Sequence, residues 1–148
     1  LILAPVVNVF GVEYQDRYMP DRRDLNRSFP GSPNGSLSRR IAHALFSNLV
    51  PLCDFGIDLH SAAAQRVNFP NIRGDLSIPG VRRIAGAFGC ELIVNGKGPE
   101  GSLRREACAA GCPTVILEAG EPNKIEPTVL EIGYRGVRNV LVELDMLA

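Results

Sequence analysis

Short apolar runs alternate along this chain with segments in which apolar residues recur every three or four positions. The runs are rich in β-branched and aliphatic residues, which predicts strands over residues 1–10, 55–59, 92–94 and 114–117, with 55–59 and 114–117 buried. The spaced segments predict amphipathic helices over residues 36–50, 81–88 and 102–111, and from Pro127 onward with Leu130, Val137, Val140, Leu141 and Leu144 buried. Alternating strands and helices indicate an α/β fold, with a mixed, largely parallel sheet and helices on both faces.

Two segments between these elements are long for loops of a compact domain. Residues 13–35 are polar and rich in proline, and residues 61–76 have no regular pattern, so both are expected to be irregular. Loops of this length are usually functional or disordered. A serine precedes each of two predicted helices, and we expect Ser36 and Ser102 to cap them.

The composition argues against several classes of partner. Of 148 residues, 45% are hydrophobic, enough for one domain with a substantial core. Sixteen acidic residues balance sixteen basic ones, which argues against nucleic acid or a membrane surface as a partner. No apolar run approaches the roughly 18 residues of a membrane span, and the first residues lack the features of a signal peptide. We therefore expect a cytoplasmic protein, of an oligomeric state that the composition does not specify.

The cysteines do not form a recognisable metal or disulfide pattern. No two of them have Cys-x-x-Cys spacing, and we expect small buried hydrophobes at Cys53, Cys90, Cys108 and Cys112.

A histidine motif, Asp58-Leu59-His60, ends the apolar run that starts at Phe55. The carboxyl end of a buried strand is where open α/β sheets place their active sites. The chain has two histidines, so only two residues could bind a metal or carry out acid–base catalysis through an imidazole. A neutral imidazole is a common zinc ligand, and Asp58 can orient it. Considered alone, such a motif is more often a histidine that caps a strand end through ordinary hydrogen bonds.

Candidate carboxylate-binding residues lie in the long polar loop, in Asp24-Leu25-Asn26-Arg27. The planar guanidinium of Arg27 can hold a carboxylate through two hydrogen bonds, and Asn26 can add a neutral donor beside it. Arg17 can supply a second positive charge. The alternative is a solvated basic loop, because other arginines are nearby.

A candidate general base, Glu118, directly follows the apolar run Pro113–Leu117. A carboxylate at the tip of a buried strand can take a proton from an attacking water and return it to a leaving amine. Without other motifs, it is equally typical of a glutamate that emerges into solvent. In the predicted helix before this strand, Arg104 can point toward a substrate, although Arg105 is an equally good surface residue.

Together these motifs resemble the zinc-dependent succinylglutamate desuccinylase/aspartoacylase family, whose members are related to the zinc carboxypeptidases. Asp24-Leu25-Asn26-Arg27 resembles the family's substrate-binding signature, and Arg17-Tyr18 resembles a segment whose arginine polarises the scissile carbonyl. Asp58-Leu59-His60 is similar to the third zinc-ligand motif. Leu117-Glu118-Ala119-Gly120 is similar to the strand end with the catalytic glutamate, and Gly101–Arg104 to a segment with a functional arginine.

The resemblance implies a zinc-carboxypeptidase-like fold and zinc-dependent hydrolysis of the amide bond of an N-acyl amino acid or a related small amide. It implies that Glu118 and Arg17 are catalytic and that His60 is a ligand of one zinc ion, which lowers the pKa of bound water to about 7. Asn26 and Arg27 would hold a substrate carboxylate, and Arg104 would face the substrate.

One family feature is missing from the sequence. The zinc-ligand pair His-x-x-Glu does not occur, and a zinc site with an open position needs three protein ligands. We therefore expect residues 1–148 to be a partial catalytic domain, with a sheet incomplete at its N-terminal side and without the family's C-terminal β-rich domain. Such a fragment should bind zinc poorly and be inactive alone. Two alternatives remain: a metallocarboxypeptidase-type peptidase, and a non-catalytic scaffold that has lost its metal site.

Overall fold

The computed structural model describes residues 1–148, in which four strands form one sheet of order β1-β4-β2-β3. The strands are β1 (Gly56–His60), β2 (Asn68–Gly74), β3 (Leu92–Asn95) and β4 (Thr114–Gly120). β1 is parallel to β4 and β2 is parallel to β3, whereas β2 and β4 are antiparallel. The predicted mixed, largely parallel sheet is therefore confirmed.

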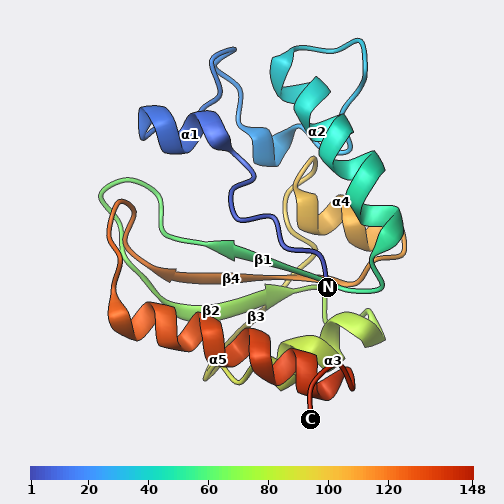
Figure 1. The fold of residues 1–148 in the computed structure, drawn as a ribbon, viewed down its shortest axis with the longest axis vertical. Coiled ribbons are helices and arrows are strands. Elements are labelled where there is room, and N and C mark those ends of the chain that lie inside the picture. The colour runs from blue at the N-terminus through green and yellow to red at the C-terminus, as the bar shows by residue number, and fades with distance from the viewer.

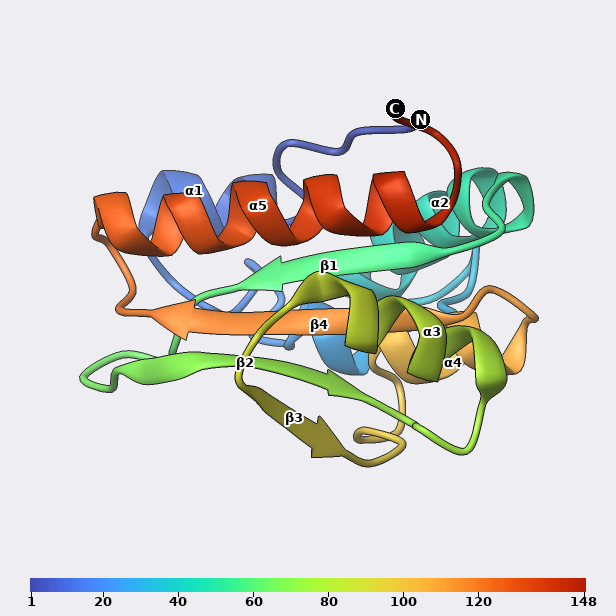
Figure 2. The same ribbon diagram turned by 90° about the horizontal axis from the view of Figure 1, so that it is seen from below.

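Helices cover both faces of the sheet, as predicted (Figures 1 and 2). On one face lie α3 (Pro79–Phe88) and α5 (Pro127–Glu143). On the other face lie α1 (Val9–Tyr14), α2 (Leu37–Leu49) and α4 (Leu103–Ala109). Two short 3-10 helices, Leu25–Arg27 and Val50–Leu52, complete the elements. None of the helices combines the length and apolar composition needed to cross a membrane.

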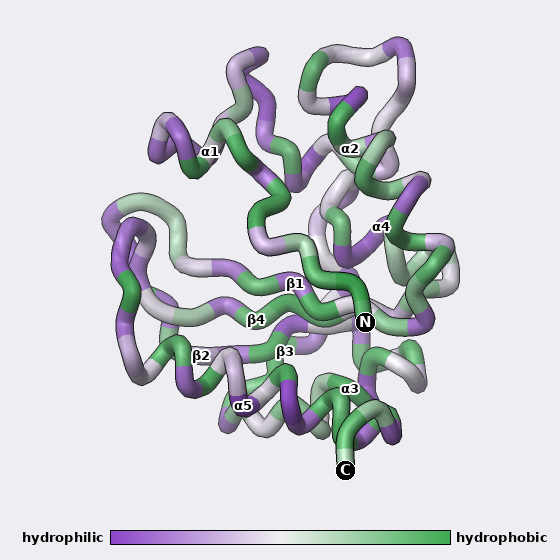
Figure 3. The backbone as a smooth tube through the Cα atoms, viewed as in Figure 1, coloured by the Kyte–Doolittle hydropathy of each residue, from purple (hydrophilic) through white to green (hydrophobic).

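The main core lies between the sheet and the helices α3 and α5. Alternate side chains of β4 point into it, namely Val115, Leu117 and Ala119. The opposite face of β4 therefore carries Glu118. Hydrophobic and hydrophilic residues alternate in short stretches along α5, as expected for a helix with one face on a sheet (Figure 3). A second, smaller core packs the long loop under α2 and is formed by Met19, Leu25, Phe29 and Ala42.

The close approach of α3 and α5 depends on Gly136. A Cβ atom at this position would lie 2.0 Å from Cε1 of Phe88, a side chain that is 2% exposed. We expect Gly136→Ala to lower the free energy of unfolding by about 1–3 kcal/mol, because the helices must separate, although alanine is the better helix former. Gly133→Ala is the matched control, because its Cβ would meet only Leu117 Cδ2 at 3.6 Å. Urea unfolding measures both variants, and a Gly136→Ala protein as stable as the Gly133→Ala protein would contradict this account.

The long loop caps two helices from a distance. The amide of Ser38, in the first turn of α2, donates to Asp21 Oδ2 at 2.8 Å. The amide of Leu103, at the start of α4, donates to Asn26 Oδ1 at 2.8 Å. Ser36 and Ser102 occupy the N-cap positions, as expected, but their side chains make no capping hydrogen bond. The helices begin where expected, but side chains of the loop satisfy their first amides.

The cap on α2 makes stability depend on pH. Partial burial by itself raises the pKa of Asp21, but hydrogen bonds, chiefly those from the hydroxyl and amide of Ser38, hold it below its usual value. The folded state therefore gains stability above the unfolded pKa of about 4, and loses it as the pH falls through the lower folded pKa. We expect Asp21→Ala to cost about 1 kcal/mol at pH 7. Unfolding curves from pH 7 to pH 3 should show this cost shrinking, and a constant difference would contradict it.

Three expectations about the elements are wrong. Residues 1–10 form no strand, because nothing pairs with them, and the segment instead enters α1, where Asn8 accepts from the amide of Gly11 at 2.9 Å. Residues 61–76 are not wholly irregular, because they contain β2. Leu130 is 59% exposed, since it lies beside the helical stripe of α5 that includes Gly136 and Val140.

Candidate active site

The polar side chains of β1 and β4 meet at the carboxyl end of this parallel pair. In the strand register His60 lies opposite Glu118, and Asp58 lies opposite Ile116. Because side chains alternate along a strand, Asp58, His60 and Glu118 project from the face opposite the main core. His60 Nε2 lies 2.8 Å from Asp58 Oδ2. The structure thus brings together His60 and Glu118, two of the predicted site residues.

Nearby charges raise the pKa of the His60 imidazole above its usual value. Burial by itself lowers this pKa, but the hydrogen bond and charge of Asp58, with the charge of Glu118, outweigh it. The positive charge of Arg17 acts in the opposite direction and lowers this pKa. In the neutral tautomer that donates from Nε2 to Asp58, Nδ1 is the nitrogen with a free lone pair.

Arg17 is held in place by Asp24. Its Nε and Nη2 both donate to Asp24 Oδ2, at 3.0 and 2.7 Å. The Asp24 side chain is largely buried, whereas that of Arg17 is 49% exposed. One edge of the guanidinium is therefore fixed, and Nη1 makes no hydrogen bond within the protein.

Asn26 and Arg27, the predicted carboxylate pair, have different surroundings. The Oδ1 atom of Asn26 caps α4, which leaves its Nδ2 group to donate to a ligand. The Arg27 side chain is 44% exposed, and its Nη1 donates to the main-chain oxygen of Asn26 at 2.6 Å. The same Nη1 atom of Arg27 lies 4.0 Å from Asp24 Oδ2. Asn26 therefore has a structural role in addition to any role in binding, and Arg27 is open to solvent.

Arg104 is the buried member of the Arg104–Arg105 pair. It is 6% exposed, and its Nε and Nη1 atoms have no hydrogen-bond partner, whereas Arg105 is exposed. Burial lowers the pKa of the Arg104 guanidinium, and the charge of Arg73 adds to this, against the opposing charges of Glu118 and Asp58. An arginine nevertheless stays charged in proteins. The site therefore holds a buried, unpaired cation on the side of the sheet that carries Glu118.

Strand β2 adds residues that sequence reasoning missed. Asn68 Nδ2 donates to Glu118 Oε2 at 2.7 Å, and Arg73 Nη1 lies 3.9 Å from Glu118 Oε1. Asn71 Nδ2 donates to the main-chain oxygen of Glu118 at 3.3 Å, and Asn71 Oδ1 accepts from Arg73 Nε at 2.9 Å. The one signal in the sequence was apolar Ile72 between polar Asn71 and Arg73, a short stretch of strand alternation.

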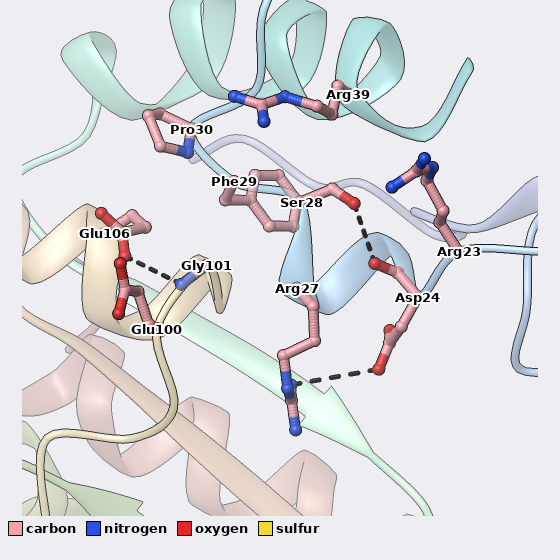
Figure 4. A pocket seen from close by; sticks show the side chains of 10 residues that line it. All are labelled: Arg23, Asp24, Arg27, Ser28, Phe29, Pro30, Arg39, Glu100, Gly101 and Glu106. Atoms are coloured by element: carbon pink, nitrogen blue, oxygen red, sulfur yellow. Dashed lines mark hydrogen bonds and ion pairs between the residues drawn. The ribbon is translucent and has the colours of Figure 1, made fainter. Parts of the chain in front are cut away.

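A cavity of about 630 Å³ lies beside the loop that carries Arg27. Figure 4 shows Glu100 and Glu106 on one side of it, and Arg23 and Asp24 on the other. Neither His60 nor Glu118 lines this cavity. Of the predicted site residues, Arg27 alone lines this cavity.

The polar cluster does not form a zinc site by itself. No group of three or more His, Cys, Asp or Glu side chains is arranged to hold a metal ion, and all four cysteines are free. His60 Nδ1 has the chemistry of one ligand. Glu118 Oε2 accepts a hydrogen bond from Asn68, and Asp58 Oδ2 is bonded to His60. By themselves these residues therefore fall short of the three protein ligands that a catalytic zinc site requires.

Comparisons with known proteins agree with the geometry. Residues 1–144 match the model of the succinylglutamate desuccinylase/aspartoacylase catalytic domain. Over 62 residues, the chain is 42% identical to N-alpha-acetyl-L-2,4-diaminobutyric acid deacetylase from Halomonas elongata; this region is 41% of the chain and 18% of the relative.

Solved structures give the same result over nearly the whole chain. A succinylglutamate desuccinylase/aspartoacylase from Rhodobacter sphaeroides is similar with a TM-score of 0.86 and 30% identity, covering 97% of this chain and 45% of that protein. The product-bound ectoine utilization protein EutE (DoeB) from Ruegeria pomeroyi is similar with a TM-score of 0.88 and 26% identity, covering 98% of this chain and 47% of that protein. The chain spans less than half the length of these proteins. With the family model matched from residue 1 to residue 144, the chain belongs to the succinylglutamate desuccinylase/aspartoacylase family.

Proposed function

We propose that this chain is part of the catalytic domain of a deacylase, which hydrolyses the amide bond of a small N-acyl amino acid. The observation that carries this proposal is the buried, unpaired guanidinium of Arg104 on the side of the sheet that carries Glu118. A buried cation without a partner favours an anionic ligand, and an amino acid supplies a carboxylate. The family match and the deacetylase relative support the same reaction class.

The chain's own residues provide the parts of an amide hydrolysis. Glu118 takes a proton from the attacking water and returns it to the leaving nitrogen, which needs a carboxylate held in one orientation. Arg17, fixed by Asp24, stabilises the negative charge that develops on the acyl oxygen. Arg104 holds the substrate carboxylate, and Asn26 and Arg27 add donors from the loop.

We also propose that the complete protein holds one zinc ion with His60 as a ligand and two further ligands from outside these 148 residues. The support is the free Nδ1 of His60 and its placement opposite Glu118. Metal analysis of the complete protein should find one zinc per chain, reduced in His60→Ala. Residues 1–148 alone should bind zinc weakly and show no turnover. Tight binding of one zinc by this segment would contradict the proposal.

Amine release from a panel of substrates tests the reaction. N-acetyl-2,4-diaminobutyrate, N-acetylaspartate and N-succinylglutamate are suitable probes, with a short peptide bearing a free C-terminus as the comparison. We expect the complete protein to release amine from an N-acyl amino acid and to leave the peptide intact. Preferential trimming of the peptide would favour a carboxypeptidase, and no release from any probe would favour a non-catalytic protein.

A further inference from the structure

A β-bulge in β2 determines which side chains reach Glu118. In the antiparallel pairing of β2 with β4, Asn71 lies opposite Glu118, but Asn68 lies opposite Gly120, with a register shift between them. An unbroken ladder would instead place residue 69 opposite Gly120, because each step along one strand matches one step along the other. The extra residue turns Asn68 onto the face that carries Glu118.

The sequence at the bulge fits this arrangement. Pro70 has no amide hydrogen, and bulges are among the few places in a sheet that tolerate proline. Phe69, whose side chain would otherwise share the face of Glu118, is 62% exposed. Bulges often occur next to active sites, where they redirect a side chain.

The redirected side chain makes the shortest contact to the Glu118 carboxylate. Asn68 Nδ2 lies 2.7 Å from Oε2, whereas Arg73 Nη1 lies 3.9 Å from Oε1, beyond hydrogen-bond distance. Arg73 is in turn held by Asn71, which also donates to the main chain of Glu118. One carboxylate oxygen is thus bonded and the other is free to exchange a proton.

We propose that Asn68 is a positioning residue that fixes the Glu118 carboxylate, with Oε2 as the held oxygen and Oε1 as the oxygen that transfers the proton. This inference rests on the proposed function, in which Glu118 is the base. A neutral amide suits the role, because it restricts rotation of the carboxylate without neutralising it. A displaced base lowers turnover more than substrate binding.

The test is a double-mutant cycle in the complete protein. We expect Asn68→Ala to lower kcat roughly 10- to 100-fold with KM unchanged. Asn68→Asp keeps the shape but lacks the donor, and should also lower kcat. In a Glu118→Gln background, Asn68→Ala should cause no further loss, because its effect acts through the carboxylate. Phe69→Ala is the matched control, since it alters the neighbouring exposed side chain of the bulge and should keep full activity.

Several results would overturn the proposal. Asn68 variants with normal kcat would refute it, as would an equal loss from Asn68→Ala with and without Glu118. A raised KM at normal kcat would make Asn68 a substrate-binding residue instead. These outcomes differ from failure of the proposed function, in which the unmodified protein itself hydrolyses no N-acyl amino acid and both proposals fall.

Discussion

Replacement of Glu118 by glutamine is expected to lower kcat of the complete protein roughly 10²- to 10⁴-fold, while KM stays close to that of the unmodified enzyme. Glutamine keeps the shape of the side chain and can still face Asn68 and Arg73. It cannot accept a proton from water at neutral pH. The loss should therefore fall on the proton-transfer steps and leave substrate capture intact.

Steady-state kinetics on the best substrate of the panel measure this effect. Glu121→Gln is a suitable control, because Glu121 lies just beyond β4 and pairs with Lys124 near the surface. That variant should be fully active. A Glu118→Gln enzyme with near-normal kcat would exclude Glu118 as the base, and a large rise in KM alone would assign it to substrate binding.

Arg104→Met is expected to have opposite effects on substrate capture and on stability. Methionine fills much of the same space but cannot bind a carboxylate, so kcat/KM for N-acyl amino acids should fall roughly 10²-fold or more. The same change removes a buried guanidinium whose Nε and Nη1 are unpaired. The ligand-free protein should therefore gain about 1–3 kcal/mol in free energy of unfolding.

Arg105→Met provides the matched control for this prediction. Arg105 is the exposed neighbour on the same helix, and its replacement should change neither quantity much. Kinetics and urea unfolding of both variants give the answer. An Arg104→Met protein that is less stable, with unchanged kcat/KM, would mean that Arg104 stabilises the fold and does not bind the substrate.

Elements that carry their own signal were predictable from the sequence. The apolar run that becomes β4 is buried between two neighbouring strands, and the run that becomes β1 forms the edge strand beside it. The stripe of α3 ends at Gly89, which has a positive φ of 84°. Strand β2 was missed because its bulge interrupts the alternation of side chains between the two faces of the sheet, and because proline, here Pro70, is atypical of a strand. Residues 1–10 have strand composition, but a strand also requires a neighbour that pairs with it.

Some residues of the candidate site were likewise predictable from local sequence, and others were not. His60 and Glu118 were predictable together, because both lie at the ends of strands that proved to be parallel neighbours. The contact of Asn68 with Glu118 joins residues 50 positions apart, and no local pattern predicts it. Likewise, the cap on α4 comes from Asn26, 77 positions away. Arg104 is buried and Arg105 is exposed, and this difference depends on how α4 packs against the sheet.

The central claim is that a substrate carboxylate binds Arg104 on the side of the sheet where Glu118 acts. A crystal structure of the complete protein soaked with its product amino acid tests it most directly. The account predicts the product carboxylate within hydrogen-bond distance of Arg104 Nε or Nη1, with the amine toward Glu118. A product bound instead in the cavity lined by Arg23, Arg27 and Arg39, with Arg104 still unpaired, would contradict it.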